Sequence, residues 1–313
     1  MNNEATTKNV RTFRRLEDLN LIDNFLFQQM LMQEEDGEKF ARILLSTILG
    51  KKIRNVKITS QKNILGIDTD KHGIRLDAYI EDVSDADNPD LADAEIIPDI
   101  YDIEPNNSYE KETLPKRTRY YHGLIDTQLL ATGAGYDKLP NVIIIVILPY
   151  DPFDQNRMVY TIRNHCHEVP NLPYDDGARK IFLYTKGTQG NPSQSLKDML
   201  KYIQESTKEN VTNEDIASIE QLVNKVKHKK EVGINYMKSW EVEEMARKQG
   251  YQDGFDDGFN NGFNNGFNDG FNDAAKKMNQ LIIFLTEANR TDDILKAAKD
   301  SAYQNLLFKE FNL

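Results

Sequence analysis

Two segments, GIRLDAYIED at residues 73–82 and DIYDIEPN at residues 99–106, determine the fold that we expect for this chain. In both segments apolar and polar residues alternate, and this period of two predicts strands that each have one apolar and one polar face. Asp77 and Glu104 both fall on the polar face of their strand. Because consecutive strands usually pair with each other, the two segments predict a hairpin.

The register of this hairpin decides whether the two carboxylates lie together. A register that places Asp77 opposite Glu104 also places Tyr79 opposite Asp102, and facing side chains then have Cβ atoms about 5 Å apart. Two carboxylates at that distance repel each other unless a cation compensates their charge. The simplest candidate is a divalent metal with oxygen ligands, Mg²⁺ first and Mn²⁺ as an alternative. The competing interpretation is a solvated strand face, on which acidic residues need no function.

A basic segment, LPKRTRYYHGLID at residues 114–126, follows the second strand directly. Its proline suits the first turn of a helix, and apolar residues continue beyond it at helical spacing. Lys116, Arg117 and Arg119 therefore fall in the first turns of that helix. Cations that hold phosphates beside a metal-binding acidic pair are the combination that phosphodiester cleavage requires. Without the acidic pair, a solvated charged turn would explain the same residues.

The order of these segments resembles that of the PD-(D/E)XK nucleases of the transposase type, also called recombination-promoting nucleases. The motifs in combination are more specific than any one alone. The resemblance covers about residues 16–245 and implies an α/β fold, with a restriction-endonuclease-like mixed sheet flanked by helices and followed by a helical C-terminal region. The matching segments are DNFLFQQML (23–31), RLD (75–77), YDIEPN (101–106), LPKRTRYYHGLID (114–126), GYDKLPNVIIIVILPYDPF (135–153), RMVYTIRNHC (157–166) and YDDGARKIFLYTKG (174–187).

The resemblance also implies a function, a Mg²⁺-dependent endonuclease that cleaves double-stranded DNA in transposition or recombination. On it, Asp77 is the metal-binding aspartate and Glu104 is the second acidic ligand. The position of the motif lysine is occupied by Asn106, and an amide can donate a hydrogen bond but carries no charge. This departure leaves a second hypothesis open, an inactive nuclease-like module that binds DNA or protein and assembles through its tail.

The basic residues have two expected roles. Lys116 is the closest basic residue of the helix start, and we expect it to replace the missing lysine by offsetting charge at the reacting phosphate. Arg117 and Arg119 point elsewhere, because successive helix residues turn by about 100°, and at most one of them shares the direction of Lys116. We expect both arginines, together with Arg75, to bind the DNA backbone.

Segments on either side of the hairpin predict the rest of the sheet. A core helix at about residues 16–32 and a second helix after it precede a basic strand at residues 51–60, which would be the first strand of the sheet. Residues 141–148 form a continuous β-branched run, as expected for a strand buried on both faces. Two shorter strands at residues 158–163 and 180–184 would extend the sheet. The order predicts a mixed α/β sandwich.

Four regions are expected along the chain. They are a nuclease-like domain at residues 1–190, a helical accessory region at 191–250, a tetrapeptide repeat at 251–274 and C-terminal helices at 275–313. The chain has enough apolar residues for one sizeable core and a smaller second one.

The net charge of −11 is unusual for a protein that binds DNA, but the distribution of the charge removes the objection. Residues 81–112 contain twelve acidic residues and one lysine, so the remainder of the chain sums to zero. Most of these acidic residues lie in one loop, which we expect to be a solvated connection.

Composition excludes membrane and secreted classes of protein. No apolar run reaches the roughly 18 residues of a membrane span, and the longest candidate is NVIIIVIL at residues 141–148. Residues 1–15 are polar and basic, which predicts no secretory signal. The single Cys166 excludes an internal disulfide and suits a reducing compartment. We therefore expect a cytoplasmic protein.

The tail holds a repeat of four residues, YQDG FDDG FNNG FNNG FNDG FNDA, at residues 251–274. In a helix its phenylalanines would form a stripe that drifts by about 40° per repeat. Each glycine, however, costs about 1 kcal/mol relative to alanine, so the repeat should not be helical alone. It is either a flexible spacer or an element that folds on association. We favour a homo-oligomer formed through residues 251–274.

Overall fold

The computed structural model describes residues 14–64, 74–84 and 97–313 of the chain. Contacts between residues divide the chain into two compact units, Met1–Met237 and Lys238–Leu313. The boundary lies within the long helix α6 (Lys230–Glu287), so the expected accessory region at residues 191–250 does not form a unit of its own. Its first helices belong to the core of the first unit.

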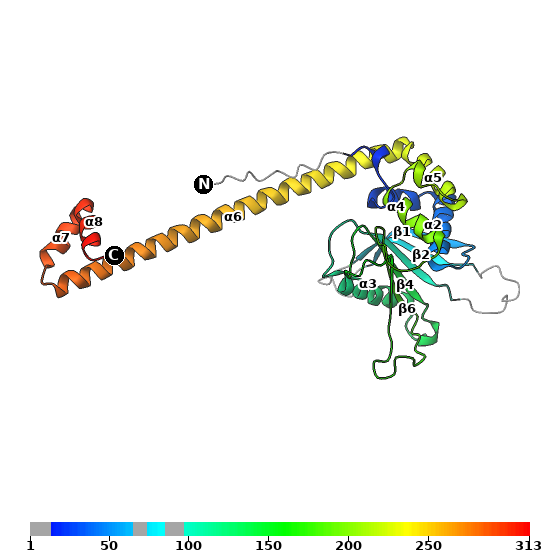
Figure 1. Cartoon of the computed structure of the whole chain (residues 1–313), viewed down its shortest axis with the longest axis horizontal. Helices are drawn as coiled ribbons and strands as arrows, with labels where there is room; N and C mark the ends of the chain where they lie inside the picture. The colour runs from blue at the N-terminus through cyan, green and yellow to red at the C-terminus, as the bar shows by residue number, and fades with distance from the viewer. Residues whose placement is uncertain (1–13, 65–73, 85–96) are drawn as a thin grey trace. The chain divides into compact units, whose positions relative to one another are not determined.

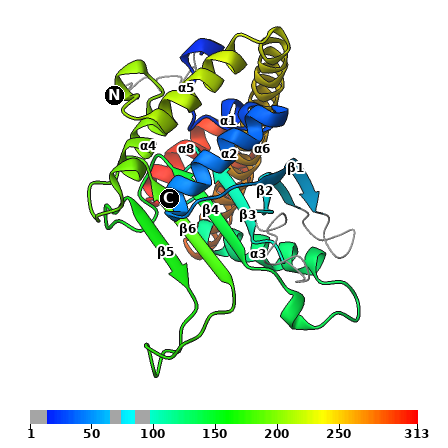
Figure 2. The ribbon, with the colours of Figure 1, turned by 90° about the vertical axis from the view of Figure 1, so that its right-hand side faces the viewer.

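Within the described residues, the first unit is built on a six-stranded mixed sheet with the order β1-β2-β3-β4-β6-β5 (Figure 2). The pairs β1–β2, β2–β3 and β5–β6 are antiparallel, whereas β3–β4 and β4–β6 are parallel. The expected α/β class, with a mixed sheet flanked by helices, is confirmed. The strands are β1 (Val56–Ile64), β2 (Ile74–Asp82), β3 (Ile100–Pro105), β4 (Val142–Leu148), β5 (Val159–Arg163) and β6 (Ala178–Tyr184).

Helices cover both faces of this sheet (Figures 1 and 2). Four helices and the first residues of α6 join one large apolar cluster with the sheet residues that face them. On the opposite face, the helix that packs on the sheet within the described residues is α3 (Leu114–Leu129). The expected helix at residues 16–32 is in fact a short 3-10 helix, Leu16–Asp18, followed by α1. The four helices are α1 (Asn24–Leu31), α2 (Glu34–Leu49), α4 (Gln194–Gln204) and α5 (Glu214–Lys227).

The central strands are buried on both faces. Every residue of β3 and β4 is buried, as the β-branched run of β4 predicts. On β2, Tyr79 is buried against α3, and Ala78 is buried on the other face. The polar face that the alternation predicts for β2 and β3 is therefore not solvated, because α3 covers it. This cover places acidic side chains in the interior.

The second unit consists of helices joined by short turns. The end of α6 packs against α7 (Thr291–Lys299) and α8 (Ser301–Glu310) around a small core of Leu281, Leu285, Ala297 and Leu307. The tetrapeptide repeat lies inside α6, so it is helical in the structure, whereas the glycine content alone argues against a helix. None of the helices in the described segments is both long enough and apolar enough to cross a membrane.

Candidate active site

The hairpin of β2 and β3 brings the predicted carboxylates together. The two strands pair antiparallel with Tyr79 opposite Asp102, where the recorded pairing ends. Asp77 and Glu104 each lie two residues beyond this pair, close enough for the charge of Asp77 to raise the pKa of Glu104. Asp102 and Glu104 are two residues apart on one strand, so they share the face that α3 covers. Three carboxylates from two neighbouring strands therefore form one cluster, which we call the carboxylate cluster.

Asp102 is the residue of this cluster that the sequence motifs do not indicate. Its side chain is 0% exposed, and neither carboxylate oxygen has a hydrogen-bond partner among the described residues. Burial, followed by the charges of Glu104 and Asp77, raises the pKa of Asp102 well above its usual value. Its spacing of two residues from Glu104 was the signal in the sequence that could have revealed it.

Glu104 and Asp77 are also shifted toward their protonated forms. Burial, together with the charge of Asp77, raises the pKa of Glu104 to about 8, and Arg117 opposes this only in part. Burial likewise raises the pKa of Asp77, even though a hydrogen bond from Gln28 favours the ionised form. At neutral pH Asp102 and Glu104 therefore favour their protonated forms, and they would ionise more readily if a cation took the place of the protons.

Arg117 supplies the basic group nearest to the carboxylate cluster. Its Nη2 atom lies 3.6 Å from Oε2 of Glu104, and its Nη1 atom hydrogen-bonds to Glu110. The guanidinium carbon is 5.8 Å from the ring centroid of Tyr121, one helical turn further along α3. The prediction that Arg117 points away from the site is therefore wrong. Arg117, and not Lys116, is the basic residue of α3 whose side chain is directed at Glu104.

The other predicted basic residues lie at the surface. Lys116, Arg119 and Arg75 are all exposed, and Lys116 forms no ion pair within the described segments. Arg75 is adjacent to Asp77 on β2, and its charge partly lowers the pKa of that carboxyl. These three exposed side chains can contact a polyanion at the surface, but none of them is placed against Glu104 as Arg117 is.

Asn106 lies just beyond the end of β3 and is buried. Its backbone N–H donates to the carbonyl of Ile147 at 2.9 Å, which continues the β3–β4 pairing by one residue. Its side-chain Oδ1 accepts a hydrogen bond from the backbone N–H of Ser108 at 2.9 Å. The Nδ2 group has no partner in the part of the chain that is described. The motif position of the lysine thus holds a buried amide with a donor to spare.

Helix α1 contributes a residue that the motif analysis did not assign to the site. Nε2 of Gln28 donates to Oδ1 of Asp77 at 2.6 Å, and Nε2 of Gln61 donates to Oε1 of Gln28 at 3.0 Å. Gln61 has a positive φ of 52° and interrupts the β1–β2 pairing opposite Asp77. This irregularity turns its side chain toward Gln28. Two neutral amides therefore orient Asp77 without compensating its charge.

The carboxylate cluster was tested for its fit to a metal ion. In residues 14–64, 74–84 and 97–313, no group of three or more His, Cys, Asp or Glu side chains is arranged as a complete metal site. Mg²⁺, however, is usually held by only one or two carboxylates, with water and substrate phosphates completing its coordination. The unpartnered oxygens of Asp102 and the raised pKa of Glu104 fit a cation beside Asp77 and Glu104.

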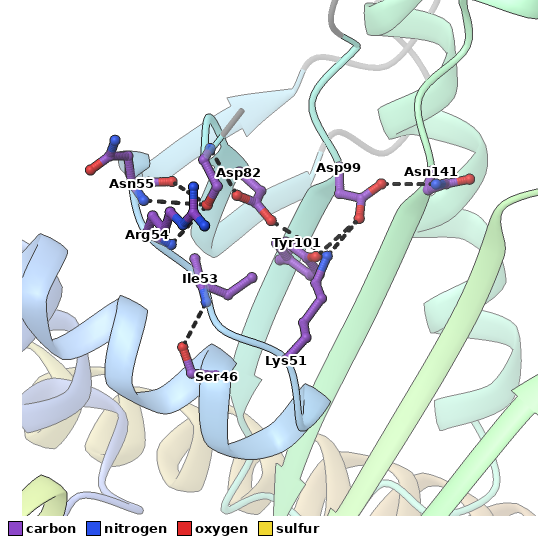
Figure 3. Close-up of polar contacts among 10 residues, drawn as sticks. Ser46, Lys51, Ile53, Arg54, Asn55, Asp82, Asp99, Tyr101 and Asn141 are labelled. Carbon is purple, nitrogen blue, oxygen red and sulfur yellow. Dashed lines mark hydrogen bonds and ion pairs between the residues drawn. The ribbon is translucent and has the colours of Figure 1, made fainter. Parts of the chain in front are cut away.

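A second acidic group, at the opposite end of β3, shows what a fully paired cluster looks like in this protein (Figure 3). Nζ of Lys51 lies 3.1 Å from Asp99 and 3.5 Å from Asp82, and Asn141 donates to Asp99 at 2.8 Å. Burial would raise the pKa of Asp99, but the hydrogen bonds from Asn141 and Lys51 outweigh it and lower the pKa. This group ties the loop after α2 to the sheet and needs no ligand.

The other flank of α3 borders a cavity of about 560 Å³ over β5 and β6. Arg119 lines this cavity together with Asp126 and Lys180, so it is directed away from the carboxylate cluster, as the helical geometry predicts. His122 also lines it and is buried, and burial followed by the charge of Lys180 lowers its pKa to about 4. His122 is therefore neutral at neutral pH.

The structure thus joins the buried Asp102 and Glu104 with the half-buried Asp77 and Arg117 in one site. Asn106 lies just beyond the strand that carries Asp102 and Glu104. Comparisons with protein-family models, with characterised proteins and with solved structures found no match to this chain. The nuclease resemblance consequently rests on the sequence motifs, and the geometry of the site is an independent line of argument.

Proposed function

We propose that this chain is a metal-dependent DNA endonuclease that hydrolyses phosphodiester bonds at the carboxylate cluster. The observation that carries the proposal is Asp102, a fully buried carboxylate with two unpartnered oxygens beside Glu104 and Asp77. Such a group destabilises the fold unless a ligand compensates it, and strongly shifted titratable groups gather at functional sites. The contrast with Asp99, which is fully paired, supports a functional rather than a structural reason.

Asp77 and Glu104 would hold the metal, Mg²⁺ or Mn²⁺, with Asp102 supplying negative charge behind them. When bound, the metal polarises the phosphate and lowers the pKa of a water molecule. Gln28 keeps the Asp77 carboxylate in one orientation through its 2.6 Å hydrogen bond. Arg117, held between Glu104 and Glu110, is placed to neutralise a phosphate oxygen at the same site.

The residues around the cluster supply binding rather than chemistry. The free Nδ2 group of Asn106 can donate to a phosphate oxygen or to the attacking water, but it brings no positive charge. Lys116, Arg119 and Arg75 are exposed and would contact the DNA backbone. The motif resemblance adds that the substrate is double-stranded DNA undergoing transposition or recombination, in the cytoplasm.

A second candidate function is a nuclease-like module that binds DNA without cleaving it. The observation that favours it is Asn106 at the lysine position, together with the exposure of Lys116, the residue that was expected to replace the motif lysine. In this case the cluster would bind a metal that bridges protein and phosphate without activating water.

The deciding experiment is incubation of the purified protein with supercoiled plasmid, with chelator, Mg²⁺ or Mn²⁺. We expect nicking or linearisation that needs the metal and is lost in Asp77→Ala and in Asp102→Asn. The matched control is Asp137→Asn, which removes an exposed carboxylate from the 3-10 segment Tyr136–Lys138 and should cleave normally. Equal activity in the wild type and the site variants would indicate a contaminant. Metal-dependent DNA binding without cleavage would select the second candidate.

A further inference from the structure

The tetrapeptide repeat in α6 presents a row of aromatic side chains that nothing in the described chain covers. Phe255, Phe259, Phe263, Phe267 and Phe271 are 59–68% exposed. The first four stack in sequence, with ring centroids 6.3 Å apart and interplanar angles of 14–15°. This spacing equals the rise of about four residues of helix, about 6 Å, so the rings form a continuous ridge along one side of α6. We call it the phenylalanine ridge.

The glycines of the repeat have no role within the chain. A Cβ atom added at Gly254, Gly258, Gly262, Gly266 or Gly270 would meet no other atom within 4 Å, and none of these glycines has a positive φ. Gly37 shows the opposite case, because a Cβ atom there would lie 2.6 Å from the carbonyl oxygen of Leu31. The repeat therefore omits five side chains that its own fold would accommodate.

The glycines of the repeat destabilise an isolated helix. Five glycines lower the stability of the helix by roughly 5 kcal/mol relative to alanine. The exposed phenylalanines add no stabilisation while they face water. The glycines and the exposed phenylalanines both lack a stabilising contact within the chain, and they occur in the same repeats. An interaction in which phenylalanine rings fill the space beside the glycines would account for both.

The two rows have the geometry of a ridge and a groove. Each glycine precedes a phenylalanine, so the glycine row lies next to the phenylalanine ridge, about 100° around the helix. Both rows follow residues spaced by four, which run at about 26° to the helix axis. Two helices that keep such rows in contact over several repeats wind around each other in a right-handed supercoil, because the four-residue period exceeds the 3.6 residues of a helical turn. Small residues let the two backbones approach closely.

We propose that residues 251–274 form a self-association surface whose occupant is a second copy of the same chain. The phenylalanine ridge of each copy lies in the glycine groove of the other. Ridge and groove have the same four-residue spacing because they belong to the same repeat, so one sequence supplies both halves of a two-fold contact. Burial of four phenylalanines from each copy would remove roughly 1,000 Å² from water, which reaches the size of the smaller specific interfaces.

Charge argues against the other occupants. Residues 251–274 contain five aspartates and no lysine or arginine. DNA and anionic lipid surfaces would be repelled by this segment. Two copies of the chain would meet without charge repulsion at the centre of the repeat, because residues 258–268 carry no charged side chain.

The test uses three variants of the full chain and measures mass against concentration by analytical ultracentrifugation. The first replaces Gly258, Gly262 and Gly266 with alanine, which fills the groove and at the same time favours the helix. The second replaces Phe259 and Phe263 with alanine. The matched control replaces Asn261 and Asn265 with alanine, because these asparagines lie about 160–200° from the neighbouring phenylalanines on the opposite side of α6.

We expect the wild type and the asparagine variant to form dimers with similar dissociation constants. The glycine variant should dissociate at least 10-fold more readily although its helical circular dichroism rises, and the phenylalanine variant should be monomeric. A monomeric wild type at high micromolar concentration would overturn the proposal. A glycine variant that associates as tightly as the wild type would also overturn it, because the rings would then associate without the groove.

Discussion

Replacement of Glu104 by glutamine tests the electrostatics of the carboxylate cluster directly. The folded pKa of Glu104 is raised from 4.5 to about 8 by burial and by Asp77. A group with a raised folded pKa takes up a proton on folding, so its contribution to stability is present at low pH and is lost as the pH rises from about 4.5 to about 8. Glutamine has nearly the same shape and does not titrate, so the variant should lack this loss.

The size of the effect follows from the shift. At about 1.4 kcal/mol per pKa unit, the full shift corresponds to at most about 5 kcal/mol. Most of the loss falls between about pH 5 and about pH 8.5, and the pKa of about 8 already includes the opposing charge of Arg117. We therefore expect the free energy of unfolding of the wild type to fall by about 2–4 kcal/mol relative to Glu104→Gln over this interval.

The assay is urea unfolding at about pH 5 and about pH 8.5 in the presence of chelator. Unfolding is monitored by near-ultraviolet circular dichroism. Glu112→Gln, which changes an exposed glutamate at the entry to α3, is the matched control and should follow the wild type. A difference between wild type and Glu104→Gln that does not change with pH would refute the reasoning. Replacing the chelator with Mg²⁺ should restore the lost stability in the wild type and not in Glu104→Gln, because the metal replaces the proton as the compensating charge.

Four further predictions concern single residues. Arg117→Ala should lower the cleavage rate at saturating DNA by about 10²-fold, the effect of removing one charge-stabilising donor. Lys116→Ala should instead weaken DNA binding and reduce its salt dependence, and single-turnover rates with a salt titration would expose the reverse pattern. The wild type should lose thermal stability as the pH falls from about 6.5 to about 4, because only the unfolded state takes up the His122 proton in that interval. His122→Gln should not show this loss. A difference in melting temperature between the two proteins that stays constant over this pH interval would contradict the prediction. Gly37→Ala should destabilise the fold by about 1–3 kcal/mol, because its Cβ would lie 2.6 Å from the carbonyl oxygen of Leu31, and an unchanged urea midpoint would refute it.

Part of the site follows from local pattern. The period of two in the segments around Asp77 and Glu104 predicts two strands, and a hairpin then has few registers that keep its apolar face intact. The structure pairs Tyr79 with Asp102, the register that would also bring Asp77 and Glu104 to facing positions. The same pattern contained Asp102, since residues two apart on a strand share a face, although no motif singled it out.

The assignment of the basic group was less secure for a physical reason. The segment shows which residues form α3, but the rotation of the helix about its axis depends on which side chains the sheet buries. Leu114, Thr118 and Ile125 are among the buried residues of α3 that set this rotation, and Arg117 lies on the same side of the helix. Lys116 is turned about 100° away from Arg117 and faces the surface.

The sequence by itself determined the strands, their order along the chain and the pair of carboxylates that faces across the β2–β3 hairpin, because these depend on periodicity and on neighbouring segments. Only the tertiary structure decided that α3 buries the acidic face, that Gln28 reaches Asp77 from 49 residues away, and that Arg117 rather than Lys116 meets Glu104. The alternation of apolar and polar residues shows that the two faces of a strand differ. Which helix packs on each face depends on contacts between segments that are distant in the sequence. The desolvation that raises the pKa of Asp102 and Glu104 comes from that cover, so no local pattern contains it.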